Sequence, residues 1–305
     1  MSVASPGLRD LRDIPLEHTP MINMIKYPNN PMTRWSALAG SKLSSIRQGN
    51  VSVNADLQHL SLIVYAIPLE RVEEWIPFSL QLEESAKKKS KVAWLSIVSF
   101  MDQGTPANGR MQFEQTSYRL QIMRDRQPAS WLLGISLGSL AGVAMRNLWP
   151  MPWHLSAMEF EVNYDRDDHH YHNYRLQTQS QWVNANWELS DTGEKLSADR
   201  LKKLQIPASL YSGISDNYFM RRDDSLGLFR THYHGWALNQ GEMKSAKCDL
   251  LEGFGLLTRD ELKKPALVAI QHKVSCQIFS PTIISDRHLN AGECPVPGTR
   301  FAFAT

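Results

Sequence analysis

The stretch that decides the interpretation of this chain lies near its middle, where residues 145–154 read MRNLWPMPWH. The segment before it, Gly138 to Trp149, carries apolar residues at helical spacing and predicts a helix. Pro150 ends that helix, because proline lacks the amide hydrogen that would continue it. Trp153 and His154 then stand at the entrance to a predicted strand, so a helix exit delivers two aromatic rings to the start of a sheet.

Working outward, most of the chain is typical of strands. Short helices are predicted at Leu69 to Ile76, which begins after a proline, and near Leu210 to Tyr218. The predicted strands are Leu60–Ile67, Val92–Phe100, Phe113–Met123, Trp131–Leu137, Ser156–Tyr164, Tyr171–Gln179, Trp182–Leu189, Leu228–Trp236, Gly241–Leu251 and Ala266–Phe279. Strands outnumber helices about three to one without regular alternation, which favours an antiparallel α+β or barrel fold over a doubly wound sheet.

The chain is expected to form a single domain over residues 35–305. Residues 1–34 are rich in proline and have only short apolar pieces, so we predict an extended arm. Such an arm would suit packing on a neighbouring subunit of a homo-oligomer, and a partly ordered tail explains it equally well.

Composition excludes several classes of partner. Thirty-three basic and 31 acidic residues among 305 leave a net charge of +2, so nothing favours nucleic acid or an anionic membrane. No uncharged apolar run approaches the ~20 residues of a membrane span, and the N-terminus does not resemble a signal peptide. Three cysteines without CxxC spacing favour a reducing compartment. We expect a cytoplasmic protein that binds a small molecule.

Strand alternation assigns candidate residues to faces. Counting every second residue from His154 gives Ser156, Met158, Phe160, Val162 and Tyr164, so His154 is predicted on an apolar face. The same count places Glu114 with Thr116, Tyr118, Leu120 and Ile122, and Arg119 on the opposite face.

An imidazole and a carboxylate that face an apolar interior are costly unless they are paired, hydrated or used. Burial raises the pKa of a carboxylate and lowers that of a histidine, toward values useful for proton transfer. His154 and Glu114 are therefore candidates for catalysis. The alternative is that each is a satisfied polar group in the core.

The stretch at 145–154 resembles the signature of the acetoacetate decarboxylase-like superfamily, in which a Gly-Arg-Glu run is followed by Pro-Lys-Lys. Arg146 and Pro152 match, whereas Trp153 stands at the Schiff-base lysine and His154 at the lysine beside it. Glu114 falls where the family has a cavity-lining glutamate.

The chain is similar, over roughly residues 55 to 282, to the superfamily's domain-of-unknown-function branch, which also has Pro-aromatic-His at this point. His232, His234 and Trp236 form a further similar segment. The resemblance implies a cone-shaped β-barrel with few helices and a largely apolar internal cavity, which Trp153, Trp236 and Tyr118 would help to line. It does not imply decarboxylation.

The departures from the family signature exclude its chemistry at this position. Imine catalysis needs an amine with a depressed pKa, and Trp153 has none. Another lysine could take that role, with Lys247 and Lys273 on predicted strands, but Lys273 shares a solvent-facing pattern with polar residues. His154 can act only as acid, base or hydrogen-bond donor.

Other chemistries find little support. His232 and His234 point the same way on a strand, as two metal ligands often do, and Glu114 or His154 would have to supply a third. No GxSxG, P-loop or HExxH pattern is present. We therefore expect neither a metal nor another cofactor.

Together these residues favour an enzyme acting on a carbonyl compound, such as a β-keto acid, polyketide or enone, without a Schiff base. His154 and Glu114 would transfer protons, and Arg146 or Arg119 would hold a carboxylate or oxyanion. A lyase, isomerase, hydratase or cyclase fits this set. The alternative is a non-catalytic protein that binds an apolar small molecule.

Overall fold

A computed structural model describes residues 52–77, 80–82, 85–87, 90–103, 112–139, 151–211, 213–221, 225–234, 237–279 and 281–284. All of them belong to one compact unit, Gly40–Thr305. The arm predicted for residues 1–34 lies outside the described residues, as does the predicted helix from residue 140 onward.

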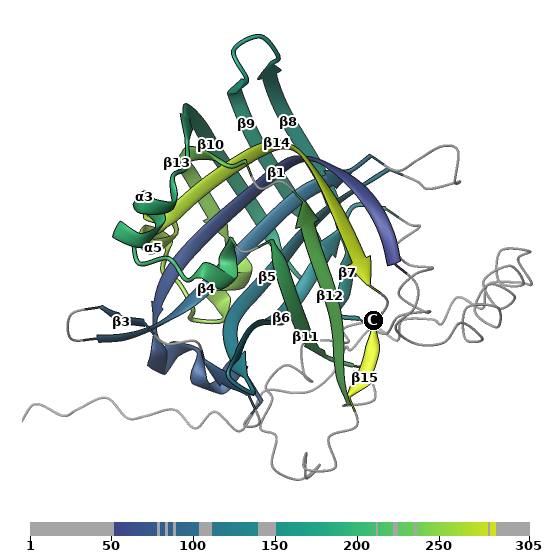
Figure 1. The fold of residues 1–305 in the computed structure, drawn as a ribbon, viewed down its shortest axis with the longest axis vertical. Coiled ribbons are helices and arrows are strands. Elements are labelled where there is room, and N and C mark those ends of the chain that lie inside the picture. Colours follow the sequence, from purple (N-terminus) through teal and green to yellow (C-terminus); the bar gives the residue numbers. More distant parts are fainter. Residues whose placement is uncertain are drawn as a thin grey trace, which may run out of the picture. The chain divides into compact units, whose positions relative to one another are not determined.

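Seven strands of the described residues close into a barrel (Figure 1). The order around the barrel is β12–β11–β6–β5–β4–β1–β14, and β12 pairs with β14 to close it. The strands are β1 (Ser52–Pro68), β4 (Ser90–Asp102), β5 (Phe113–Arg124), β6 (Gln127–Leu137), β11 (Ile214–Met220), β12 (Leu226–His234) and β14 (Leu267–Phe279). Neighbours are antiparallel except β6 and β11, so the predicted antiparallel β-barrel is confirmed.

The sheet continues from β14 beyond the barrel as β13 (Asn239–Cys248), β10 (Asn184–Lys195), β9 (His170–Gln179) and β8 (Ala157–Asp165). The β8–β9 hairpin projects from the top of the ribbon in Figure 1. Four short strands pair with barrel strands: β2 (Gln81–Leu82) with β5, β3 (Ser85–Lys87) with β4, β7 (Trp153–Leu155) with β6 and β15 (Thr282–Ile284) with β12.

The helices among the described residues are short. They are η1 (Leu69–Arg71), η2 (Glu73–Trp75), α3 (Ala198–Lys203), η4 (Ala208–Leu210), α4 (Asp249–Gly253) and α5 (Arg259–Leu262). None is long and apolar enough to cross a membrane. The helix predicted at Leu69 to Ile76 is thus two 3-10 turns rather than one α-helix.

The prediction of a helix near Leu210 to Tyr218 is wrong. The chain makes the 3-10 turn η4 and then enters β11, which pairs with β12 on one side and β6 on the other. Hydrogen bonds to two neighbouring strands outweigh the weak local preference of so short a segment.

β1, β4 and β14 are buried on both sides of the barrel wall, whereas Arg230 and His234 are exposed on the outer side of β12. One cluster, which includes Leu62, Trp94, Val98 and Tyr233, lies inside the barrel. A larger one joins the outer side of β1, β4 and β5 to the extension β8–β9–β10–β13. β1 and β4 therefore contain nearly continuous apolar runs, Leu60–Ile67 and Val92–Phe100, because both of their faces are covered.

One backbone irregularity keeps β1 in this arrangement. The pairing of β1 with β4 shifts between Gln58 and Ser61, and His59 adopts the left-handed φ of 52°. The bulge changes the parity of the strand, so that Leu57 before it and Leu60 after it both belong to the inner cluster.

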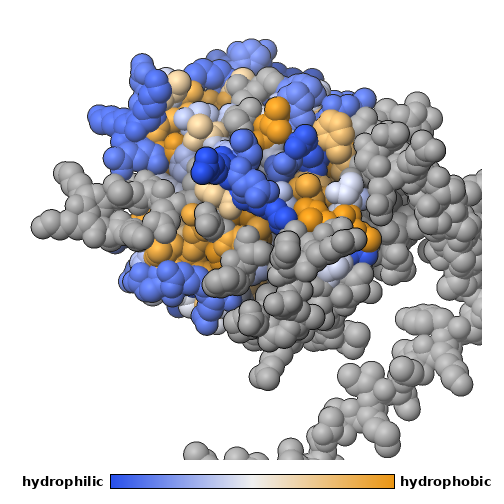
Figure 2. Space-filling view, turned by 60° about the horizontal axis from the view of Figure 1, so that its bottom comes forward, coloured by the Kyte–Doolittle hydropathy of each residue, from blue (hydrophilic) through white to orange (hydrophobic). Residues whose placement is uncertain are grey.

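The surface of the described part is mixed in character. Figure 2 shows apolar areas on the end of the unit that faces the viewer, divided by hydrophilic side chains. The large apolar side chains that are most exposed are Leu155, Ile214 and Ile283.

Candidate active site

Two of the predicted residues, His154 and Glu114, lie in one row of side chains on the outer face of the barrel wall. β7 runs parallel to β6 with His154 opposite Ser136, and β6 runs antiparallel to β5 with Ser136 opposite Thr116. Residues paired across neighbouring strands share a face, so Thr116, Ser136 and His154 lie side by side. Glu114 precedes Thr116 by two positions and therefore shares that face.

Trp182 covers this row. Its indole stacks on the imidazole of His154, with centroids 4.1 Å apart, and meets the ring of Tyr118 edge-on at 5.4 Å. The ring lies against Gly134 so closely that any β-carbon there would collide with it. Trp182 precedes β10 rather than starting the strand predicted from it, and this places its side chain over β6 and β7.

Glu114 has a similar position over a glycine. Its Oε2 lies within collision distance of the position that a β-carbon of residue 138 would take, and the Gly138 amide donates a hydrogen bond to the Glu114 carbonyl at 2.9 Å. The side chains of Glu114 and His154 are both half-buried. Their strands are separated by β6, so about 10–12 Å lies between the two Cα atoms.

Ser136 is the polar group within this row that stands out. Its Oγ is buried and has no hydrogen-bond partner among the described residues. Its neighbour Thr116 is satisfied, since that hydroxyl donates to Ser99 Oγ at 2.9 Å. An unsatisfied buried hydroxyl costs free energy of folding, and a bound molecule or water is the usual way to recover it.

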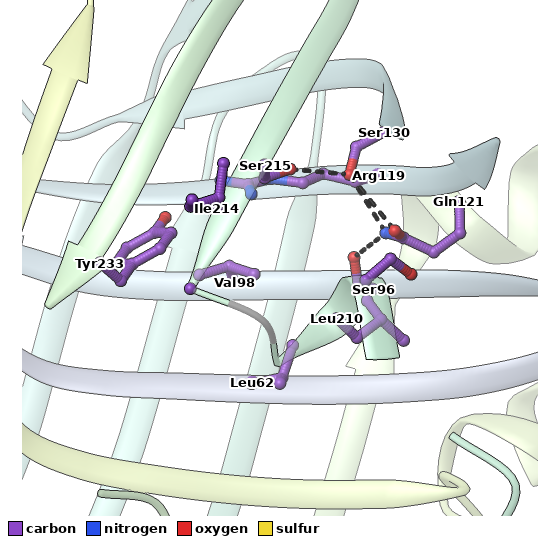
Figure 3. A pocket seen from close by; sticks show the side chains of 12 residues that line it. Leu62, Ser96, Val98, Arg119, Gln121, Ser130, Leu210, Ile214, Ser215 and Tyr233 are labelled. Carbon is purple, nitrogen blue, oxygen red and sulfur yellow. Dashed lines mark hydrogen bonds between the residues drawn. The ribbon is translucent and has the colours of Figure 1, made fainter. Parts of the chain in front are cut away.

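Arg119 lies on the other face of β5, as alternation predicts, and that face is inside the barrel. It is only 5% exposed, and its Nε donates to Ser117 Oγ at 2.9 Å. Figure 3 shows it among side chains that converge from six barrel strands. The residues around this interior pocket are Leu62, Ser96, Val98, Arg119, Gln121, Ser130, Ser209, Leu210, Gly213, Ile214, Ser215 and Tyr233.

The interior pocket is small, and its lining mixes polar and apolar side chains. Its volume is about 20 Å³, which is room for about one water molecule. Gln121 Nε2 donates hydrogen bonds to Ser96 and Ser130, at 3.2 and 3.3 Å. A hydrogen bond of 3.2 Å between Ser130 and Ser215 continues this network (Figure 3). The expectation of a largely apolar cavity is not confirmed, and Arg119 and Glu114 cannot contact one small molecule across the wall.

Trp153 points into the barrel, opposite to His154. It packs on an apolar cluster of Leu132, Ile135, Met151, Phe219 and Phe229. The indole thus fills interior space at the position that the family resemblance assigns to the Schiff-base lysine.

The remaining predicted residues are dispersed. Tyr118 is buried on the same face as His154. Its burial, and to a lesser extent the neighbouring Cys248 thiol, raise the pKa of its hydroxyl well above the usual value. His232 and His234 have ring centroids 4.0 Å apart on β12. In the described part of the chain no three His, Cys, Asp or Glu side chains form a potential metal site. Arg146 and Trp236 lie outside the described residues.

The sequence analysis missed Trp182 and Ser136 as members of this site. A glycine inside a strand often marks a close approach of another group, so Gly134 was a signal for a covering ring. Nothing in the sequence identifies the ring as Trp182, because the approach depends on how the β9–β10 turn folds back.

Comparison with known proteins places these features in a family context. The model of the family DUF2071, described as an uncharacterized conserved protein, matches residues 54–275. No curated protein matches the chain.

Two of the solved structures that share its fold have a TM-score of 0.50. One is acetoacetate decarboxylase from Legionella pneumophila, with 11% identity, a TM-score of 0.50 and coverage of 77% of this chain and 88% of that one. The other is the enduracididine biosynthesis enzyme MppR with bound HEPES buffer, which has the same identity, TM-score and coverage.

Proposed function

Because this chain belongs to the DUF2071 family and has the acetoacetate decarboxylase-like fold with Trp153 in place of an interior lysine, we propose that it is an enzyme that moves a proton on a small carbonyl compound without forming an imine. The observation that carries the proposal is the row on the outer barrel face, where His154 and the unsatisfied Ser136 hydroxyl lie beside each other.

In this proposal His154 is the general base. Its ring removes a proton from the carbon next to the substrate carbonyl, and the electron pair moves to the carbonyl oxygen to give an enolate. Ser136 would donate a hydrogen bond to that oxygen. Glu114, or the His154 imidazolium, would return the proton at the same or another carbon, so that no group is gained or lost.

Trp182 would hold the imidazole in place. A ring stacked face to face on an indole has little rotational freedom, which keeps a base aligned with the bond that it attacks. A substrate of a few carbons, such as a β-keto acid or enone, fits the separation of His154 and Glu114. Arg146 remains our candidate for binding a carboxylate, since Arg119 lies inside the barrel.

The same enolate intermediate serves a lyase, an isomerase, a hydratase and a cyclase, so the first test measures the shared step. The protein is incubated in D₂O with a panel of β-keto acids and enones, and deuterium at the α-carbon is followed by mass spectrometry. We expect exchange with at least one compound, and His154→Ala should reduce its rate by about 10²–10⁴-fold.

A matched variant, His172→Ala, removes an exposed imidazole from the β8–β9 hairpin and should exchange at the wild-type rate. Wild-type exchange in folded His154→Ala would refute the assignment. Absence of exchange throughout, with an apolar molecule co-purifying unchanged, would instead establish the binding-protein alternative.

We propose a cytoplasmic location and a small-molecule substrate. Cys248 and Cys276 support the former, because both are free thiols buried in the fold. Burial raises the pKa of each to about 12, so neither is a reactive nucleophile near neutral pH.

A further inference from the structure

A second pocket lies away from the row of His154, between the β8–β9 hairpin and the strands β13 and β14. Its volume is about 230 Å³. None of the residues assigned to the proposed active site lines it. The lining residues are Tyr164, His169, Tyr171, Lys195, Ala237, Asn239, Gln271, His272 and Lys273.

The lining carries basic groups and no carboxylate. Lys195 and Lys273 both face the pocket, and neither forms an ion pair with a carboxylate in the described residues. Lys195 Nζ instead donates to the amide oxygen of Asn239 at 2.8 Å. Two ammonium groups beside one pocket repel each other, and an anion bound between them would offset that repulsion.

The acidic groups nearby are already engaged. Asp191 Oδ2 accepts hydrogen bonds from the Tyr171 amide and from Asn239 Nδ2, each at 3.1 Å, and Oδ1 accepts from the Gly193 amide at 2.9 Å. Asp165 accepts from two backbone amides of its own turn and contacts His172. Neither carboxylate lines the pocket, and neither forms an ion pair with Lys195 or Lys273 in the described residues.

The pKa of His272 reflects both its burial and the basic groups around it. Burial, and to a lesser extent the charges of His59, Lys273, Arg166 and His169, lower its pKa to about 4. The imidazole is therefore neutral at physiological pH.

A hydrogen-bonded and stacked arrangement holds the His272 ring. Tyr171 Oη lies 3.4 Å from His272 Nδ1 and 2.9 Å from His59 Nδ1. The Tyr164 ring stacks on the imidazole with centroids 3.7 Å apart. Since Nδ1 faces the tyrosine hydroxyl, Nε2 is the nitrogen available to a ligand.

We propose that this pocket binds a small oxyanion, a carboxylate or a phosphate group, between the ammonium groups of Lys195 and Lys273 with His272 as a further hydrogen-bond donor. Paired basic groups at a concave site are the usual means of holding such an anion. The volume suits a ligand of a few heavy atoms rather than one of drug size. This inference is independent of the proposed chemistry at His154.

The test is an NMR titration of the intact protein with inorganic phosphate, and separately with pyruvate, at constant ionic strength. The His272 ring resonances, assigned by comparison with His272→Gln, are followed from pH 3 to 8. An anion between the lysines should favour the imidazolium and raise the pKa of His272. The probe that binds distinguishes a phosphate ligand from a carboxylate ligand.

Lys195→Gln and Lys273→Gln should each weaken binding by roughly three- to tenfold, because each removes one charge-assisted contact at a partly exposed site. Lys244→Gln is the matched control: it is exposed on β13 and contacts Glu242, and should bind the probe as the wild type does. The proposal is overturned if neither probe moves the His272 pKa, or if both lysine variants bind the active probe with unchanged affinity.

Discussion

The imidazole of His154 lies flat on the indole of Trp182, with centroids 4.1 Å apart and an angle of 6° between the rings. His154 lies on β7, and Trp182 lies in the turn between β9 and β10. Their contact joins the barrel wall to the extension that covers it. The candidate base is therefore positioned by tertiary packing, and four predictions test this arrangement and the barrel around it.

Because Trp182 packs so closely on Gly134, replacing that glycine should destabilise the protein. In Gly134→Ala the new methyl group collides with the indole, so Trp182 must move and lose its contact with His154. We expect a loss of about 1–3 kcal/mol in the free energy of unfolding, measured by urea denaturation.

Gly253→Ala is the control, because a β-carbon there meets nothing within 4 Å. It lies at the end of α4 and should be neutral or slightly stabilising. Equal stability of the two variants would mean that Trp182 does not pack as described.

Arg119 should contribute little to stability, because a guanidinium inside the barrel loses its hydration and its hydrogen-bond partners Ser117 and Tyr233 are neutral hydroxyls. Arg119→Met should leave the free energy of unfolding unchanged or raise it by up to about 2 kcal/mol. Chemical denaturation checks this. A fall in the free energy of unfolding of more than about 2 kcal/mol would contradict this and mean that a group of opposite charge compensates Arg119.

The position of Trp153 inside the barrel predicts a gain of reactivity. Trp153→Lys places an amine among apolar side chains, where desolvation lowers the pKa of the ammonium group and leaves the nucleophilic amine at neutral pH. Borohydride reduction with a β-keto acid, read by intact-protein mass, should give an adduct in this variant and none in the wild type.

Leu155→Lys serves as the comparison, since residue 155 is 45% exposed and its amine should stay protonated. An adduct in wild-type protein would show that another lysine forms an imine, and would relocate the active site.

The Arg71–Glu261 pair should give a dependence of stability on acid. Arg71 and then the Thr258 amide, through their hydrogen bonds, lower the pKa of Glu261 from 4.5 to about 2. Because the folded pKa is the lower one, the stabilisation is present above pH 4.5 and is lost as the pH falls toward 2.

Glu261→Gln should therefore lower the free energy of unfolding by roughly 0.5–1 kcal/mol at pH 7, a modest value because the side chains are partly exposed. The difference from wild type should shrink below pH 4.5. Urea denaturation at pH 7, 5 and 3 measures it, and a difference that stays constant with pH would contradict the role of the charge.

Strand alternation in the sequence determined more than the positions of the strands. It placed Glu114 with Tyr118 on one face of β5 and Arg119 on the other, and the structure has this arrangement. The excess of strands over helices, without regular alternation between them, also predicted an antiparallel α+β or barrel fold.

Only the tertiary structure decided which face is the inside. Alternation defines two faces but not which one a closed sheet encloses, and closure depends on the pairing of β12 with β14. That pairing put Arg119 in the interior and left His154 on the outer side. The contacts of Trp182 with His154 and of Tyr171 with His59, 112 residues apart in sequence, likewise follow from the path of the β8–β10 extension. Residue spacing does not predict that path, because the side chains of the extension contact the barrel through packing between layers and not along one strand.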